Sequence, residues 1–411
     1  MKRFNTYLAE EKLKHLEHLE DALFNQGYGG AEEALRMLEE IVASLQGSAS
    51  SSVNIQSKVD GAPSIIAGTN PENGKFFVAT KSLFNKTPKI NYTDADVDAN
   101  HSGDLATKMK LALKHFPKLG IDGIIQGDFM FVPADLKKET IDGESMITFT
   151  PNTITYAVPD DQPLAKTIQS AKVGVIWHTS YTGDTIADLS AVFSVNVGAL
   201  TKTSAVWAGD TDFKDVSGTA TLTKSELSDV NGEINKARNS LKRLNKTGLK
   251  ILFGDSKEDS ISFNVNIYIN DMVSSGKKFS NKQKAIGSFI DFIRKRYQAK
   301  ADKVKTEKAK AGKLAKAEAL VKTLNSDRKI GGTFAYALEW HNNVADIKLT
   351  LIKKMEQVNT IPAFMKTATG YKVTGPEGFV AVDHMSNKAI KLVNRLEFSR
   401  NNFNAIKSWS K

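Results

Sequence analysis

A lysine, an aspartate and a glycine stand close together in Ser57-Lys58-Val59-Asp60-Gly61, directly after a β-rich run over 53–57. On an extended segment, residues two apart point to the same side, so Lys58 and Asp60 would present an ammonium and a carboxylate to one site. Gly61 would let the chain turn sharply after them. A surface strand end with a solvated lysine and an Asp-Gly turn has the same sequence, so both interpretations are open for this stretch alone.

Five further stretches carry chemically useful side chains, each in or beside a predicted strand. They are Ala79-Thr80-Lys81-Ser82, Gln126-Gly127-Asp128-Phe129-Met130-Phe131, Val175-Ile176-Trp177-His178, Pro376-Glu377-Gly378-Phe379-Val380-Ala381-Val382 and Lys388-Ala389-Ile390-Lys391-Leu392-Val393. With Lys-x-Asp-Gly in front of them, they resemble, in this order, the signature of the covalent nucleotidyltransferases. That group comprises ATP-dependent DNA ligases, RNA ligases and mRNA capping guanylyltransferases. The resemblance is closest to phage-type RNA ligases, in which a Thr-Lys-(small) stretch can follow, as Thr80-Lys81-Ser82 does here. It covers the strands within 53–200 and 370–395.

The resemblance implies a role for each residue. Lys58 would be the nucleophile that accepts AMP from ATP, in a loop shaped by Asp60 and Gly61. The nucleotide would also be contacted by Lys81, by Asp128 at the position that binds the ribose, and by Trp177, or in second place Tyr156, stacked on the purine. Glu377 and Asp60 would hold a divalent metal, and Lys391 with Lys388 would contact the α-phosphate. A buried core position is an equally open interpretation for Trp177, because aromatic side chains mostly fill cores. For His178, a surface or hydrogen-bonded role is favoured over catalysis.

These residue types suit the chemistry. A lysine attacks phosphorus only as a neutral amine, and neutralising a free lysine of pKa about 10.4 near pH 7.4 costs on the order of 4 kcal/mol. Neighbouring cations lower that cost because they disfavour the ammonium, and Lys81, Lys388 and Lys391 are the candidates. Carboxylate ligands suit Mg²⁺ or Mn²⁺, which would neutralise charge on the transferred phosphoryl group.

The charge of the chain is concentrated in one window. The 411 residues carry a formal charge of +10, and residues 281–330 hold fifteen Lys and Arg against five Asp and Glu. A basic excess confined to one segment is typical of a protein that binds a polyanion, although a solvated Lys/Ala-rich helix would look similar. We expect Arg294, Lys295, Arg296, Lys300, Lys303 and Lys305 to follow nucleic-acid phosphates.

Composition narrows the class of protein. The sequence has no cysteine, which excludes disulfides, thiolate metal sites and cysteine nucleophiles. No apolar run approaches the length of a membrane span, and the N-terminus does not read as a signal peptide, so the expected location is the cytoplasm, or the host cytoplasm if the protein is viral.

Hydrophobic periodicity divides the chain into three parts. Residues 1–50 are predicted as N-terminal helices. Residues 51–222 and 368–411 form a mostly antiparallel nucleotidyltransferase (adenylation) sheet, and residues 223–367 form a helical, basic insertion. The predicted fold class is therefore α+β. Within the insertion, 225–244, 281–296, 299–324 and 332–358 are expected to be helices.

The sequence thus predicts an ATP-dependent polynucleotide ligase that works through lysyl-AMP. Only 18 residues follow Val393, too few for the oligonucleotide-binding barrel of DNA ligases and capping enzymes, so RNA is expected ahead of DNA. Two alternatives are open: a DNA nick ligase or other nucleotidyltransferase, and a nucleic-acid-binding or virion protein that keeps the fold without catalysis. Pro63, where ligases often carry arginine, and Asp128, where they carry glutamate, favour the second alternative.

Overall fold

The chain forms two compact units. Its structure is mixed α+β with antiparallel-rich sheets, the fold class that the sequence predicts. The computed structural model describes residues 17–47, 52–213, 220–254, 257–275, 277, 284–358, 363–367, 370–374, 378–383 and 388–394. Unit 1 comprises 1–16, 54–215 and 358–389, and unit 2 comprises 17–53, 216–357 and 390–411. None of the helices in the described ranges is long and apolar enough to cross a membrane.

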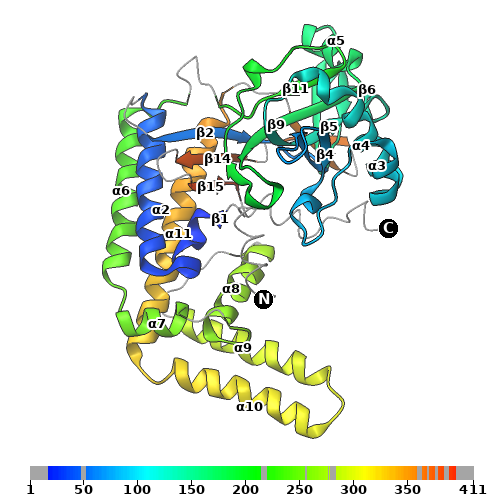
Figure 1. The fold of residues 1–411 in the computed structure, drawn as a ribbon. Coiled ribbons are helices and arrows are strands. Elements are labelled where there is room, and N and C mark those ends of the chain that lie inside the picture. Colours follow the sequence, from blue (N-terminus) through cyan, green and yellow to red (C-terminus); the bar gives the residue numbers. More distant parts are fainter. Residues whose placement is uncertain are drawn as a thin grey trace. The chain divides into compact units, whose positions relative to one another are not determined.

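A twisted sheet forms the centre of unit 1 (Figure 1). Its strand order is β10-β9-β5-β3-β4, with β11 parallel to β9 and the other pairs antiparallel. The strands are β3 (Ser64–Thr69), β4 (Phe76–Ala79), β5 (Ile124–Phe131), β9 (Val173–Thr182), β10 (Ser190–Val192) and β11 (Val206–Gly209). The turn residues Asn70-Pro71-Glu72-Asn73-Gly74 predict a hairpin between the two strands that flank them. The pairing of β3 with β4 confirms it, and Asn70 closes the turn by accepting from Glu72 N.

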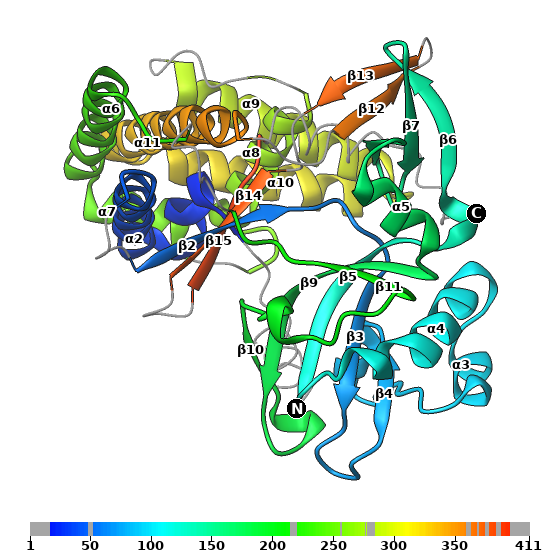
Figure 2. The same ribbon diagram turned by 90° about the horizontal axis from the view of Figure 1, so that it is seen from above.

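A second antiparallel sheet of unit 1 has the order β13-β12-β8-β7-β6 (Figure 2). It contains β6 (Lys137–Ile141), β7 (Glu144–Phe149), β8 (Ile154–Pro159), β12 (Ala363–Thr367) and β13 (Gly370–Thr374). Asp142 and Gly143 both have positive φ, at 52° and 87°, which is the geometry of a tight two-residue hairpin turn between β6 and β7. Separately, β2 (Val53–Lys58) lies beside β14 (Gly378–Asp383).

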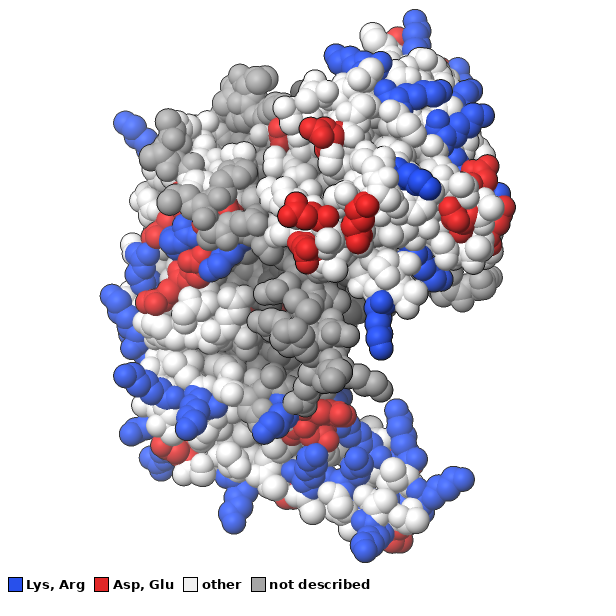
Figure 3. Space-filling model, viewed as in Figure 1, with Lys and Arg blue, Asp and Glu red and all other residues white. Residues whose placement is uncertain are grey.

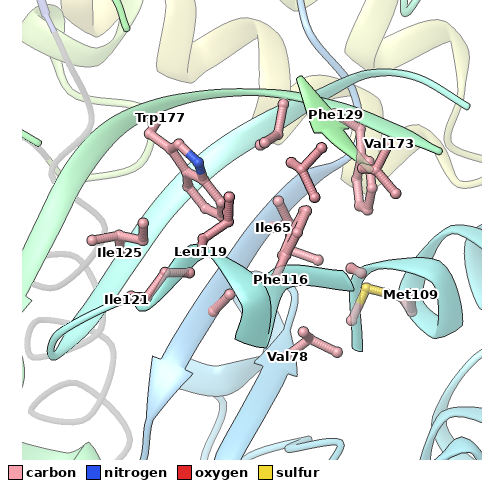
Figure 4. Packing of buried hydrophobic residues seen from close by; sticks show 14 of the residues in the cluster. Ile65, Val78, Met109, Phe116, Leu119, Ile121, Ile125, Phe129, Val173 and Trp177 are labelled. Carbon is pink, nitrogen blue, oxygen red and sulfur yellow. The ribbon is translucent and has the colours of Figure 1, made fainter. Parts of the chain in front are cut away.

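The main core of unit 1 lies between the central sheet and α4 (Gly103–His115), with α3 (Asp94–Asn100) and α5 (Pro163–Ser170) as the other helices. Alternate residues of the strands face this core, including Ile65 of β3, Phe129 of β5 and Val173 of β9 (Figure 4). The next residues along each strand face the opposite side, where Ile66, Phe77 and Tyr181 form a second cluster. The sheet is therefore covered on both faces over most of its length.

Unit 2 is helical, and the N-terminal helix belongs to it rather than forming a separate part. This helix, α2 (Ala22–Leu45), is kinked at Gly27, whose φ is 70°, and it packs against α6 and α7. Figures 1 and 2 both show α2, α6 and α11 side by side. The remaining helices are α6 (Lys224–Lys242), α7 (Lys246–Phe253), α8 (Ile261–Ser274), α9 (Ala285–Asp302), α10 (Glu307–Leu324) and α11 (Arg328–Met355). The predicted boundary between residues 1–50 and the helical insertion is thus not a boundary between compact units.

A buried ion pair joins the first segment of unit 2 to its longest helix, α11. Lys348 of α11 donates to both carboxylate oxygens of Glu20 at 2.6 and 2.7 Å, and the side chains are 1% and 2% exposed. Glu20 lies in η1 (Leu19–Asp21), directly after β1 (Glu17–His18), which pairs with β15 (Lys388–Leu392). Burial, the largest single influence, raises the pKa of Glu20, but Lys348 together with His18 and His341 lowers it by more, so the pKa is lowered overall.

Replacing Glu20 by Gln should lower the free energy of unfolding of unit 2 by roughly 3–5 kcal/mol, because the Lys348 ammonium would remain buried without its partner. The double variant Glu20→Leu/Lys348→Met should lose much less. Because the folded-state pKa of Glu20 is lowered, its stabilisation is present above about pH 4.5 and is lost as the pH falls further. Urea titrations followed by far-UV circular dichroism test both points, and equal losses in the single and double variants would contradict the pairing.

Candidate active site and nucleic-acid interface

Lys58 is the last residue of β2 and is half-buried. The strand before it is anchored on both sides within unit 1. Ser57 N donates to Thr211 O at 2.6 Å, and Gln56 Nε2 donates to Phe193 O at 3.2 Å. Since β14 is the neighbour of β2, the strand that directly follows Glu377 in the sequence lies beside the strand that ends at Lys58. Glu377 itself lies outside the described residues.

The carboxylate of Asp60 fixes the loop that follows Lys58. It is only 5% exposed and accepts three hydrogen bonds, from Asn152 Nδ2 at 2.7 Å, Thr153 N at 2.7 Å and Ile154 N at 2.8 Å. Its own amide donates to the Tyr156 hydroxyl at 2.8 Å. The loop is thereby tied to the start of β8. Nothing in the spacing of the sequence marks Asn152 as a partner, because it lies 92 residues away.

Gly61 brings the loop against Asp128 of β5. A Cβ at position 61 would stand 2.5 Å from Asp128 Cβ and 3.1 Å from Phe129 O, distances that no side chain tolerates. On either side of this contact the backbones are joined, since Ala62 N donates to Phe129 O and Phe129 N donates to Pro63 O, both at 3.0 Å. Glycine is therefore required at position 61, and Pro63 serves here through its carbonyl group.

Asp128 has a histidine beside it. His178 Nε2 lies 3.7 Å from Asp128 Oδ2, and the two side chains are 24% and 26% exposed. In the β5–β9 ladder Thr179 pairs with Gln126 and Trp177 pairs with Gly127, so His178 is the extra residue of a β-bulge. The Thr179 hydroxyl holds the ring by a 2.8 Å hydrogen bond to Nδ1. Bulges commonly re-aim side chains near functional sites. Here the bulge places His178, which was expected in a surface or hydrogen-bonded role, beside Asp128.

A chain of buried hydrogen bonds runs through Gln126, two residues before Asp128 on β5. Tyr181 OH donates to Gln126 Oε1, and Gln126 Nε2 donates to Ser64 Oγ at 3.0 Å. Burial raises the pKa of Tyr181, so its hydroxyl stays a proton donor throughout the physiological range. Ser64 is also the register partner of Asp128. The three central strands are thus linked by side chains next to the candidate site.

Lys81 reaches the same end of the sheet through the register of β3 and β4. Ile66 pairs with Ala79 and Ser64 pairs with Asp128, so the chain beyond Ala79 runs alongside the start of β3. Lys81 begins η2 (Lys81–Phe84) and is exposed, and Thr80 caps that turn by accepting from Ser82 N. The structure therefore brings Gly61 and Asp128 into contact and places Lys81 at the same edge.

Trp177 does not belong to this group, and the prediction that it stacks on a purine is wrong. Its ring is 1% exposed and packs edge-on against Phe116, with ring centroids 5.2 Å apart, inside the core of unit 1 (Figure 4). Tyr156, the second candidate, is 5% exposed and stacks on Phe149. Neither ring has a free face for a base.

The predicted metal ligands are not assembled among the described residues, where no group of three or more His, Asp or Glu could hold a metal ion. Oδ1 of Asp60 accepts from Asn152 and Oδ2 accepts from Thr153 and Ile154, so the carboxylate serves to hold the loop, and its role as a metal ligand stays a prediction.

The two lysines of the last sequence motif lie on β15, which begins in unit 1. Lys388 is exposed and Lys391 is half-buried. Ala389, between them, packs against Val380 and Val382 of β14. Lys391 falls in unit 2, where His18 of β1 is its register partner. Their contact with an α-phosphate stays a prediction.

The basic window of the sequence forms the hairpin of α9 and α10 in unit 2, and Figure 3 shows Lys and Arg side chains over it. Arg294 is paired with Glu318 at 2.9 Å, and Lys300 shares Asp259 with Lys316. Arg296 lies over the Phe263 ring. Lys295, Lys303 and Lys305 are exposed and form no ion pair with any residue that the structure describes. These three lysines are therefore the best placed of the six candidates to meet phosphates.

Replacing Asp60 by Asn should free the segment at 152–154, because an amide cannot accept from both backbone N–H groups and Asn152. We expect a loss of about 2 kcal/mol in unit 1 and faster amide exchange at Thr153 and Ile154. Asp128→Asn is the matched control, since its quarter-exposed side chain receives no backbone hydrogen bond, and it should change stability by less than about 0.5 kcal/mol. An unchanged free energy of unfolding in Asp60→Asn would refute the tether.

Comparisons with known proteins leave the function open. No curated protein and no solved structure was found to match this sequence. One family model matches residues 12–407, and its description is a family of unknown function. Because that match spans almost all of the sequence, the chain belongs to the family DUF6267.

Proposed function

We propose that this protein is an ATP-dependent polynucleotide ligase that carries AMP on Lys58, with RNA ahead of DNA as substrate. One observation supports this above all: the loop after Lys58 is locked by Asp60 and pressed by Gly61 against Asp128, at the edge of the sheet that Lys81 also reaches. A surface turn with a solvated lysine would need neither the buried carboxylate nor the close backbone contact.

The proposed reaction has three displacements at phosphorus. Lys58 Nζ attacks the α-phosphorus of ATP, a P–N bond forms, the bond to the β-phosphate oxygen breaks, and pyrophosphate leaves while the nitrogen releases a proton. A 5′-phosphate oxygen of the polynucleotide then displaces the lysine, which takes up a proton. Finally a 3′-hydroxyl oxygen attacks that 5′-phosphorus, loses its proton and releases AMP. The lysine is regenerated, so the cycle balances.

The residues of unit 1 would contribute position and charge. The tether at Asp60 limits the freedom of the loop, which lowers the entropic cost of bringing Lys58 to phosphorus. The Asp128 carboxylate, at 26% exposure, can accept hydrogen bonds from ribose hydroxyls. Lys81 would place positive charge near the phosphates and disfavour the ammonium form of a neighbouring lysine. A divalent metal would add Lewis-acid chemistry. Glu377, which lies outside the described residues, is a candidate ligand for it.

The second candidate is a nucleic-acid-binding protein of the same fold without catalysis. Two observations favour it: the Asp60 carboxylate accepts hydrogen bonds from protein donors, and the aromatic rings expected to hold a purine are buried. The basic α9–α10 hairpin serves this alternative equally well.

Incubation with α-labelled ATP and Mg²⁺ separates the two candidates. The ligase hypothesis predicts acid-labile label on the chain, lost in Lys58→Ala and retained in Lys86→Ala, an exposed lysine that serves as a matched control. Pyrophosphate treatment beforehand would strip any AMP already present after purification, so that an unlabelled site is available. Label that persists in Lys58→Ala would reject Lys58 as the nucleophile, and no label with ATP, GTP or NAD would favour the binding protein.

The role of the α9–α10 hairpin can be tested by the salt dependence of RNA binding. Changing Lys295, Lys303 and Lys305 to Gln should reduce the slope of log K against log salt for single-stranded RNA by about 2, since each lost phosphate contact removes about 0.7. Arg294→Gln with Lys300→Gln removes two charges that are already paired, and should reduce it less per charge. Label on Lys58 should be the same in all variants. Equal effects per charge in the two sets would show that the internal ion pairs do not protect Arg294 and Lys300.

A further inference from the structure

A second group of lysines surrounds His115 at the end of α4 in unit 1. Lys118 Nζ lies 3.5 Å from His115 Nδ1, and the imidazole is 7% exposed. Lys114 precedes it in the helix, and Lys172, directly before β9, is close enough to act on it electrostatically. All three lysines are exposed. Three cations therefore converge on one buried ring from two separate segments of the chain.

Helix polarity accounts for only part of this arrangement. Cations in the last turn of a helix are stabilised by its carboxyl end, which suits Lys114 and His115. Lys172 comes from another segment of the chain. Its backbone N–H donates a hydrogen bond to Ala205 O at 2.8 Å, which holds that segment in place. Lys202 follows Thr201, whose amide donates to Leu119 O at 2.8 Å, so a fourth exposed lysine joins the same surface.

These lysines differ from their neighbours in lacking a carboxylate partner. On the same helix Lys108 is paired with Asp104 and Asp135, and Lys110 is paired with Asp98. Within the described ranges, by contrast, Lys114, Lys118, Lys172 and Lys202 form no ion pair. Self-repulsion of this kind is uncompensated in the free protein and would be relieved by a bound anion.

The surface offers charge and no apolar anchor. The exposed large hydrophobic side chains of the described residues are Tyr28 and Leu314, both in unit 2. Protein interfaces usually need buried aromatic or aliphatic anchors, whereas a phosphate backbone is bound through cations alone. Figure 3 shows further Lys and Arg side chains over the α5 and β6 part of the same unit.

We infer that Lys114, Lys118, Lys172 and Lys202 form a binding surface on unit 1 for the sugar-phosphate backbone of a nucleic acid, separate from the α9–α10 hairpin. This surface requires no chemistry at Lys58. Through this surface, unit 1 would bind the polynucleotide by itself, by contacts to phosphates that do not depend on the base sequence.

The pKa of His115 reports whether an anion is bound at this surface. Burial is the main cause that lowers this pKa, and the charges of Lys118, Lys114 and Lys172 lower it further. Phosphates that neutralise those lysines should therefore raise the pKa of His115. His101 is the matched control, because its pKa is lowered by burial and by the single lysine Lys89.

The first test is an NMR pH titration of the histidines of the full chain, with and without a short single-stranded RNA. The expected result is a rise in the pKa of His115 on RNA binding while that of His101 stays unchanged. RNA that binds without moving His115 would overturn the inference. So would a His115 shift produced by an acidic peptide or anionic vesicles and not by RNA, which would assign the surface to another partner.

The second test uses the triple variant Lys114→Gln/Lys118→Gln/Lys172→Gln. It should lower the salt slope of RNA binding by about 2 and should itself raise the pKa of His115, while an unchanged pKa of His101, which burial lowers, verifies that the fold is intact. The control triple Lys224→Gln/Lys242→Gln/Lys246→Gln, with the same change of charge, should leave both unchanged. Label on Lys58 should be normal in both variants, so a failed inference and a failed ligase assignment give different results. An unaltered slope in the first triple, with the shift in His115 present, would reject the surface.

Discussion

The carboxylate of Asp60 holds the candidate site in place. It is buried, and three donors from the start of β8 satisfy it at 2.7–2.8 Å. Hydrogen bonds to a charged group contribute about 1.5–3 kcal/mol each, so the loop after Lys58 is among the more firmly held loops of unit 1. The contact of Gly61 with Asp128 depends on this tether, because the absence of a Cβ matters only if the loop stays where it is.

Several residues of this arrangement have roles other than those that the sequence predicts. The Asp60 carboxylate holds the loop through hydrogen bonds, and the aromatic rings thought to hold a base lie in the core. In their place the structure offers His178 beside Asp128, aimed by a β-bulge and held by Thr179. A nucleotide site here would rely on ribose and phosphate contacts from Asp128, His178 and Lys81.

Much of the fold is predictable from local pattern. Alternation and turn residues predict a helix over 104–116 and strands over 53–57, 64–68, 75–81, 123–132, 145–150, 153–158 and 173–179. The structure has each of these within a few residues, whereas β6 was not predicted. Alternation does not say which face of a strand is the core, so both a core position and a base-stacking position were open for Trp177. The break between α9 and α10 is marked only by the cap at Thr306, and the predicted helix over 299–324 runs through it. The pairing of Glu20 with Lys348, 328 residues apart, leaves no trace in the sequence, which is why the N-terminal helices could not be assigned to unit 2.

The measurement closest to the central claim is peptide mapping by mass spectrometry, on protein as purified and after incubation with ATP and Mg²⁺. The account predicts one AMP on the peptide that contains Lys58, in phosphoramidate linkage, and its loss when a 5′-phosphorylated RNA is added. AMP on a different lysine would contradict the assignment of Lys58. No nucleotide on any peptide, from a protein that still binds RNA, would contradict the enzyme.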